Sequence, residues 1–95
     1  MDSVDLSVFK AMQKWLEADL TLWLVTVVKT FGSSPRQPGA MLVLREDGVL
    51  VGSVSGGCIE DDLVSKAQSG ELPRNQAELM VYGVTREEAQ RFNLP

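Results

Sequence analysis

The chain has 95 residues, 44% hydrophobic and 23% charged, a composition typical of one globular domain. Its formal net charge of −4 argues against binding to nucleic-acid phosphates, and the absence of histidine excludes a Ser-His-Asp or Cys-His pair within the chain. A single cysteine, no secretory signal pattern and no apolar run of about 20 residues predict a cytoplasmic protein without a membrane span.

The first predicted element is a helix over residues 3–19, where Val4, Val8 and Met12 recur at helical spacing. Residues 20–30 are nearly continuously apolar and rich in β-branched side chains, so they are predicted to form a strand buried on both faces. Residues 31–40 contain two prolines and two glycines, which predict a loop.

The second half begins with two strands, 40–44 and 49–54, joined by an Asp47-Gly48 turn that predicts an antiparallel hairpin. A second helix is expected from Cys58 to about Ser69, followed by a fourth strand over 77–84 and a short helix from residue 85. We therefore predict a single α/β domain, with a small mixed sheet of about four strands flanked by two to three helices.

Acidic residues are absent between Thr21 and Arg45, although the chain as a whole is acidic. This stretch includes the loop "GSSPRQPG", in which two serines, backbone N–H groups and Arg36 could bind a phosphate or a pterin carbonyl. The alternative is that strands generally avoid charge and that the loop is a rigid connector whose serines cap turns.

The only cysteine, Cys58, follows "SGG" at the predicted start of the second helix, with Ser55 or Gly57 near the N-cap. Free N–H groups and the helix dipole favour a thiolate there, whereas the three carboxylates of residues 60–62 disfavour it. The direction of the pKa shift is therefore open. The alternative is that Cys58 is a small buried hydrophobe and the glycines only form a tight turn.

Taken together, the stretch "TVVKTFGSSPRQPGAMLVLREDGVLVGSVSGGCIEDDLVSKA" and the later "YGVT" resemble the N-terminal domain of the XdhC/CoxI family over roughly residues 20–93. The resemblance implies an accessory protein, not an enzyme, that binds the molybdenum cofactor (molybdopterin) as cargo. It implies that this cargo is held during sulfuration by a cysteine desulfurase. It further implies delivery to a molybdenum hydroxylase of the xanthine dehydrogenase or carbon monoxide dehydrogenase type.

The same resemblance implies a set of cofactor-binding residues, with Cys58 also a candidate molybdenum ligand. From the cysteine motif these are Ser55, Gly56, Gly57, Cys58 and Glu60, and from the loop they are Gly32, Ser33, Ser34 and Arg36. The two segments can cooperate only if the first and third strands end at the same edge of the sheet, which we therefore predict.

Other readings remain open on the same residues. Cys58 could instead carry a persulfide as a sulfur carrier, or the domain could be a protein-interaction module that binds no cofactor and buries its thiol; homodimer formation is a further expectation. From the resemblance we expect residues 1–95 to be the family's N-terminal domain alone, without the second Cys-Gly-Gly motif and the C-terminal dinucleotide-binding-like domain.

Overall fold

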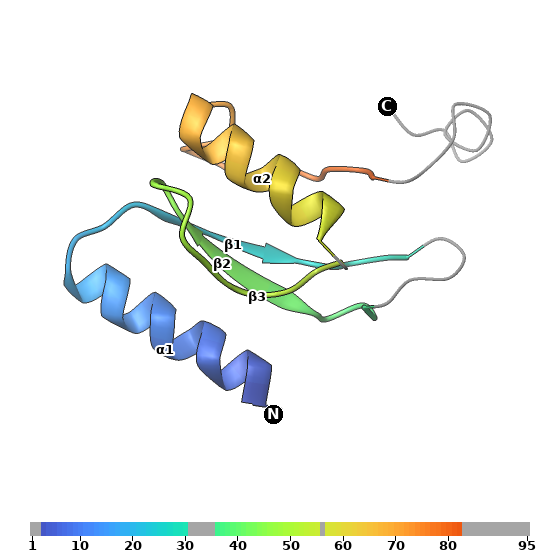
Figure 1. The fold of residues 1–95 in the computed structure, drawn as a ribbon, viewed down its shortest axis with the longest axis horizontal. Helices are drawn as coiled ribbons and strands as arrows, with labels where there is room; N and C mark the ends of the chain where they lie inside the picture. Colours follow the sequence, from blue (N-terminus) through green and yellow to red (C-terminus); the bar gives the residue numbers. More distant parts are fainter. Residues whose placement is uncertain (1–2, 31–35, 56, 83–95) are drawn as a thin grey trace.

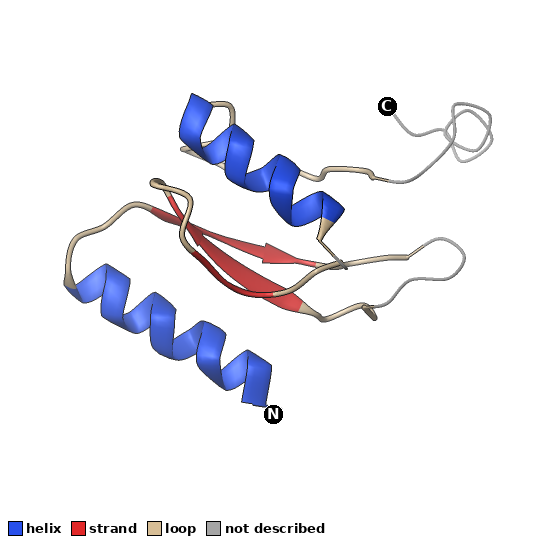
Figure 2. Cartoon of the chain, viewed as in Figure 1, coloured by secondary structure: helices blue, strands red, loops and turns tan. Residues whose placement is uncertain are grey.

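The structure, a computed structural model, describes residues 3–30, 36–55 and 57–82. It forms three layers, with one helix on each face of a sheet (Figures 1 and 2). In chain order the elements are α1 (Ser3–Glu17), β1 (Leu22–Thr26), β2 (Met41–Arg45), β3 (Leu50–Gly52) and α2 (Cys58–Ser69). The predicted α/β class is confirmed. Neither described helix has the length and apolar content needed to cross a bilayer.

The sheet has the strand order β1-β2-β3, and both neighbouring pairs are antiparallel. The prediction of a mixed sheet with about four strands is therefore wrong for the described residues, where residues 77–82 form no strand. Two side chains of this segment contact the rest of the domain. Met80 packs against the core, and the Tyr82 hydroxyl donates a hydrogen bond to a carboxylate of α2. The rest of the fourth strand and the short helix from residue 85 lie outside the described residues.

The central strand β2 carries the core. Leu42 and Leu44 point toward α2, Val43 points toward α1, and all three are fully buried. Two-sided burial was predicted for the first strand, and this is wrong: β1 is an edge strand in which Leu24 remains 44% exposed. Strands β1 and β2 are similarly rich in apolar residues, so hydrophobic content does not distinguish them. The order of strand pairing places β2 between the two helices.

The element boundaries in the second half follow local sequence signals. The hairpin between β2 and β3 is antiparallel as predicted, and Gly48 in its turn has a φ of 96°. Helix α2 runs from Cys58 to Ser69 and ends at Gly70 in the left-handed conformation, φ 80°, as expected for a glycine at a helix C-terminus. Helix α1 ends at Glu17, two residues before the predicted limit.

Candidate functional site

Arg36 and the segment that leads from β3 to Cys58 meet at one end of the sheet. Because β1 and β3 each pair antiparallel with β2, they run in the same direction and end on either side of the start of β2. The last residues of the two strands, Thr26 and Gly52, pair there with Met41 and Leu42. Beyond these strand ends, the Nε of Arg36 donates a hydrogen bond to the carbonyl oxygen of Ser53, 3.2 Å away. The predicted arrangement of the two strand ends is therefore present.

Both helices also begin at this end of the sheet (Figure 1). The first turn of α1 and the end of β3 together line an open depression of about 370 Å³, formed by Ser3, Val4, Ser7, Gly52 and Ser53. Helix N-termini carry partial positive charge and unpaired N–H groups. The end of the sheet that holds Arg36 therefore also receives the positive ends of two helix dipoles.

A compact hydrogen-bond network shapes the turn from β3 into α2. The Ser55 hydroxyl accepts hydrogen bonds from the backbone N–H groups of Gly57 (3.1 Å) and Ile59 (3.4 Å) and donates to the Glu60 carboxylate. The Ser53 hydroxyl lies 2.7 Å from the Ser55 carbonyl oxygen and 3.3 Å from a Glu60 carboxylate oxygen, so both acceptors share its proton. Ser55 thus satisfies two N–H groups at the helix start and is itself held by Glu60.

Cys58 is the first residue of α2, and its side chain is exposed. The reading in which Cys58 is a buried hydrophobe is therefore wrong. Gly57 immediately before it has a φ of 134°, and an added Cβ there would meet no atom within 4 Å. The space beside the Gly57 α-carbon is therefore open.

A metal site in a protein usually needs several cysteine, histidine, aspartate or glutamate side chains close together. Within residues 3–30, 36–55 and 57–82, no three cysteine, histidine, aspartate or glutamate side chains come together as a metal site would require. In this part of the chain, Cys58 is therefore not a member of such a group.

The predicted cofactor-binding residues divide into two groups. Arg36, Ser55, Gly57, Cys58 and Glu60 all lie at the same end of the sheet, although Ser55 and Glu60 direct polar atoms toward each other. Gly32, Ser33, Ser34 and Gly56 lie outside the described residues. Ser53 was missed from the sequence; the signal that could have identified it is a second serine two residues before Ser55, both on the approach to a helix with an early glutamate.

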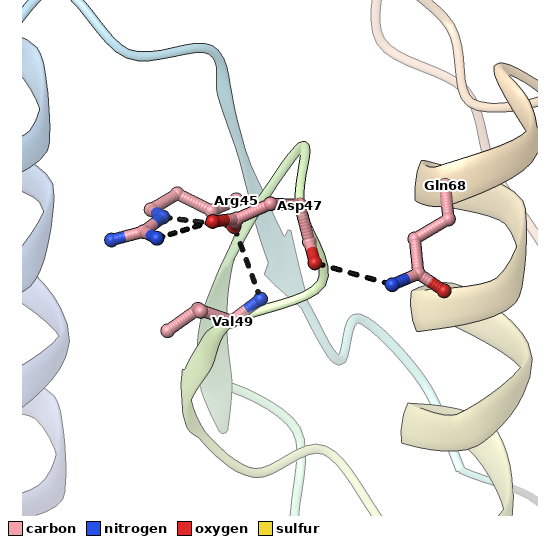
Figure 3. A network of polar contacts seen from close by, with 4 residues as sticks. All are labelled: Arg45, Asp47, Val49 and Gln68. Carbon is pink, nitrogen blue, oxygen red and sulfur yellow. Dashed lines mark hydrogen bonds and ion pairs between the residues drawn. The ribbon is translucent and has the colours of Figure 1, made fainter.

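The opposite end of the sheet has a larger open depression, of about 690 Å³, between the hairpin turn and the end of α2. Here the Arg45 guanidinium bonds both carboxylate oxygens of Asp47, whose carbonyl oxygen accepts a hydrogen bond from Gln68 of α2 at 3.2 Å (Figure 3). The bond from Arg45 lowers the pKa of Asp47. None of the predicted cofactor-binding residues lines this depression, and its polar groups tie the hairpin to α2.

The sequence is similar to those of a known protein family. A family model described as "XdhC and CoxI family" matches residues 15–83. A 37-residue stretch is 54% identical to "Molybdenum cofactor insertion chaperone PaoD" of Escherichia coli (strain K12), covering 39% of this chain and 12% of that protein. A 43-residue stretch is 37% identical to a probable xanthine dehydrogenase subunit of Bacillus subtilis (strain 168), covering 45% of this chain and 13% of that protein. The matches thus span about an eighth of each relative.

Proposed function

Because the chain belongs to the XdhC and CoxI family, we propose that it is an accessory domain that binds the molybdenum cofactor as cargo. In this role it holds the cofactor for sulfuration by a cysteine desulfurase and for insertion into a molybdenum hydroxylase of the xanthine dehydrogenase or carbon monoxide dehydrogenase type. It has no catalytic turnover of its own, and it works in the cytoplasm, where an unpaired cysteine stays reduced.

One observation carries the proposal: Arg36 and the exposed thiol of Cys58 belong to segments that meet at one end of the sheet. These two groups suit the two ends of a molybdopterin. A thiolate is a soft ligand of the kind that thiophilic metals take, and a guanidinium forms charge-assisted bonds to phosphate. The start of α1 and the start of α2 add N–H groups and positive dipole ends that favour an anion.

The hydrogen-bond network of Ser53, Ser55 and Glu60 supports the same function indirectly. It holds the backbone of the turn from which Cys58 projects, and Ser53 joins that turn to Arg36 through its carbonyl oxygen. In our proposal these three residues position the two groups that contact the cargo. Such fixed positioning lowers the entropic cost of binding.

The test is retention of the cofactor by the 95-residue chain. The chain is produced in cells that make molybdopterin and purified by gel filtration, and its content of molybdenum and molybdopterin is then measured. We expect Cys58→Ala and Arg36→Gln each to lower the retained cofactor at least about tenfold, the effect of losing roughly 1.4 kcal/mol of binding. Ser65→Ala, an exposed change on the same helix, is the matched control and should retain the wild-type amount.

The outcomes separate the parts of the proposal. Full retention by Cys58→Ala would remove the thiol from the mechanism, and full retention by Arg36→Gln would remove the arginine. A folded wild-type chain that retains no cofactor under conditions where a full-length relative does would overturn the cargo role for this domain. Unchanged circular dichroism spectra of each variant confirm that a loss is not caused by unfolding.

The exposure of Cys58 also favours a second candidate, a sulfur carrier. The Cys58 thiolate would attack the outer sulfur of a desulfurase persulfide, form a new S–S bond and release the desulfurase cysteine as a thiolate. Mass spectrometry after incubation with a desulfurase distinguishes this reading, because a persulfide on Cys58 adds about 32 Da. The interaction-module reading expected a buried thiol, which the exposed side chain does not support.

A further inference from the structure

The hydrogen bonds at the two ends of β1 show which of its backbone groups face β2. The Thr21 carbonyl oxygen accepts a hydrogen bond from the N–H of Glu46 at 3.1 Å. At the other end, the Val27 N–H donates to the Ala40 carbonyl oxygen at 2.9 Å. Backbone groups alternate in direction along a strand, so the odd-numbered residues of β1 turn their N–H and C=O groups toward β2.

The even-numbered residues Leu22, Leu24 and Thr26 therefore turn their N–H and C=O groups to the outer edge of the sheet. Among the residues that the structure describes, no group forms a hydrogen bond with this edge. Proteins usually interrupt an unpaired edge with a charge, a proline or a bulge. Strand β1 contains none of the three, since its sequence is LWLVT and it pairs with β2 without interruption. This edge therefore has the features of a template for an added strand.

We propose that an extended segment of the molybdenum hydroxylase that receives the cofactor adds to this edge of β1 as a further strand. The inference rests on the proposed function, because that function supplies the hydroxylase as a partner. It goes further by naming the surface on which the partner docks. Hydrogen bonds to the outward N–H and C=O groups of β1 hold the segment, as in other cases of strand addition.

The direction of β1 connects this edge to the candidate site. The strand runs toward the end of the sheet at which both helices begin and where Arg36 contacts Ser53 (Figure 1). A segment paired with β1 therefore has one of its ends beside the site that is proposed to hold the cofactor. Transfer of a cargo between two proteins needs such fixed proximity.

Side chains and charge define the chemistry of the docking segment. The Leu24 side chain is 44% exposed, so an apolar side chain on the added strand would cover it. No acidic residue lies between Thr21 and Arg45, whereas Lys29 follows the strand and Arg36 lies near its end. Positive charge in a stretch without acids is complementary to an acidic partner. We therefore expect an extended segment with an apolar residue beside Leu24 and an acidic residue near Lys29.

Hydrogen exchange at single-residue resolution tests the proposal. The 95-residue chain is mixed with apo-hydroxylases of the xanthine dehydrogenase and carbon monoxide dehydrogenase types, each purified from cells that make no molybdopterin. We expect one of them to slow exchange of the outward N–H groups of Leu22, Leu24 and Thr26 at least about tenfold. Exchange at Trp23 and Val25, which bond to β2 already, should stay unchanged.

Two variants of one residue separate the backbone from the side chain. Leu24→Pro removes an outward donor without removing a bond to β2, and edge strands tolerate proline at such positions. It should raise the dissociation constant of the complex at least about tenfold, whereas Leu24→Ile, which keeps the N–H and an apolar side chain, is the matched control and should leave it unchanged. Lys29→Glu should also raise this constant at least about tenfold, because it would repel an acidic segment.

Each result decides the question. Protection that alternates along β1 in the wild-type complex supports the proposal, whether or not Leu24→Pro folds. Absence of protection by either hydroxylase overturns it, as does protection without alternation. Protection in the chain alone also overturns it: a rise with concentration would assign the edge to a second copy, and a constant level to a segment of the same chain. Binding that Lys29→Glu leaves unchanged would overturn the acidic partner.

The inference and the proposed function fail separately. Leu24 lies outside the proposed cofactor-binding residues, so Leu24→Pro should retain the wild-type amount of cofactor in the gel-filtration assay while it loses docking. A wild-type chain that retains cofactor but docks on neither hydroxylase would reject this inference alone. Urea unfolding of each variant verifies that a loss of docking is not caused by a loss of the fold.

Discussion

Replacing Gly52 with alanine is expected to destabilise the domain far more than the same replacement at Gly39. The two glycines have nearly the same φ, +100° and +95°. They differ in their surroundings. An added Cβ at Gly52 would lie 2.5 Å from the Met41 carbonyl oxygen, 2.6 Å from a Val8 methyl carbon and 2.9 Å from the Leu42 Cα, whereas at Gly39 it would meet nothing within 4 Å.

The magnitude follows from two separate terms. A left-handed conformation costs an alanine roughly 1–2 kcal/mol at either position, partly offset by about 0.4–1 kcal/mol because alanine restricts the unfolded chain. At Gly52 two of the obstructing atoms are backbone atoms of β2, which cannot move without disturbing the sheet. Such overpacking costs typically about 1–3 kcal/mol. Gly52→Ala should therefore be about 1–3 kcal/mol less stable than Gly39→Ala.

Urea unfolding, followed by the fluorescence of the half-buried Trp23 and the buried Trp15, measures this difference. Thermal unfolding provides a second readout, because 1 kcal/mol corresponds to about 4–8 °C in a domain of this size. If the free energies of unfolding of the two variants agree within about 0.5 kcal/mol, the close approach of α1 to β3 at Gly52 does not constrain the fold, and the reasoning fails. The result bears on the site, because it identifies Gly52 as a packing residue at the end of the strand that leads to Cys58.

Three further expectations concern local interactions. Ser55→Ala removes the acceptor for two backbone N–H groups at the start of α2 and should cost about 1 kcal/mol in urea unfolding, whereas Ser65→Ala on the same helix should cost less than about 0.5 kcal/mol. Hydrogen bonds from Tyr82, and then from a lysine, lower the pKa of Asp62 below 3.8, so the free energy of unfolding should fall as pH drops through the lowered pKa. Asp62→Asn should reduce this loss of stability at acid pH. An unchanged dependence of stability on pH would contradict the role of Asp62. Trp23→Phe removes an indole N–H bond of 2.7 Å to a carbonyl oxygen after α2 and should cost about 0.5–1.5 kcal/mol; a neutral result in the same assay would refute that role.

Local signals in the sequence were sufficient to predict the elements whose ends are set by residues adjacent in the chain. Helix α2 begins at Cys58 and ends at Ser69 as predicted, because glycines stand at both of its ends. The β2–β3 hairpin follows from the Asp47-Gly48 turn for the same reason. The family was also recognisable from the cysteine motif and the arginine loop, and the family match over residues 15–83 confirms it.

Tertiary structure alone decided which apolar strand is central, because hydrophobic content does not encode pairing order: β1 looked like a core strand in the sequence, yet it lies at the edge. It also decided that the predicted fourth strand does not pair over residues 77–82. At the site, the sequence indicated Cys58 and Arg36 but not whether the thiol was exposed or which backbone atom the arginine contacts. These properties arise from contacts between segments far apart in the chain, which local periodicity and turn signals do not specify.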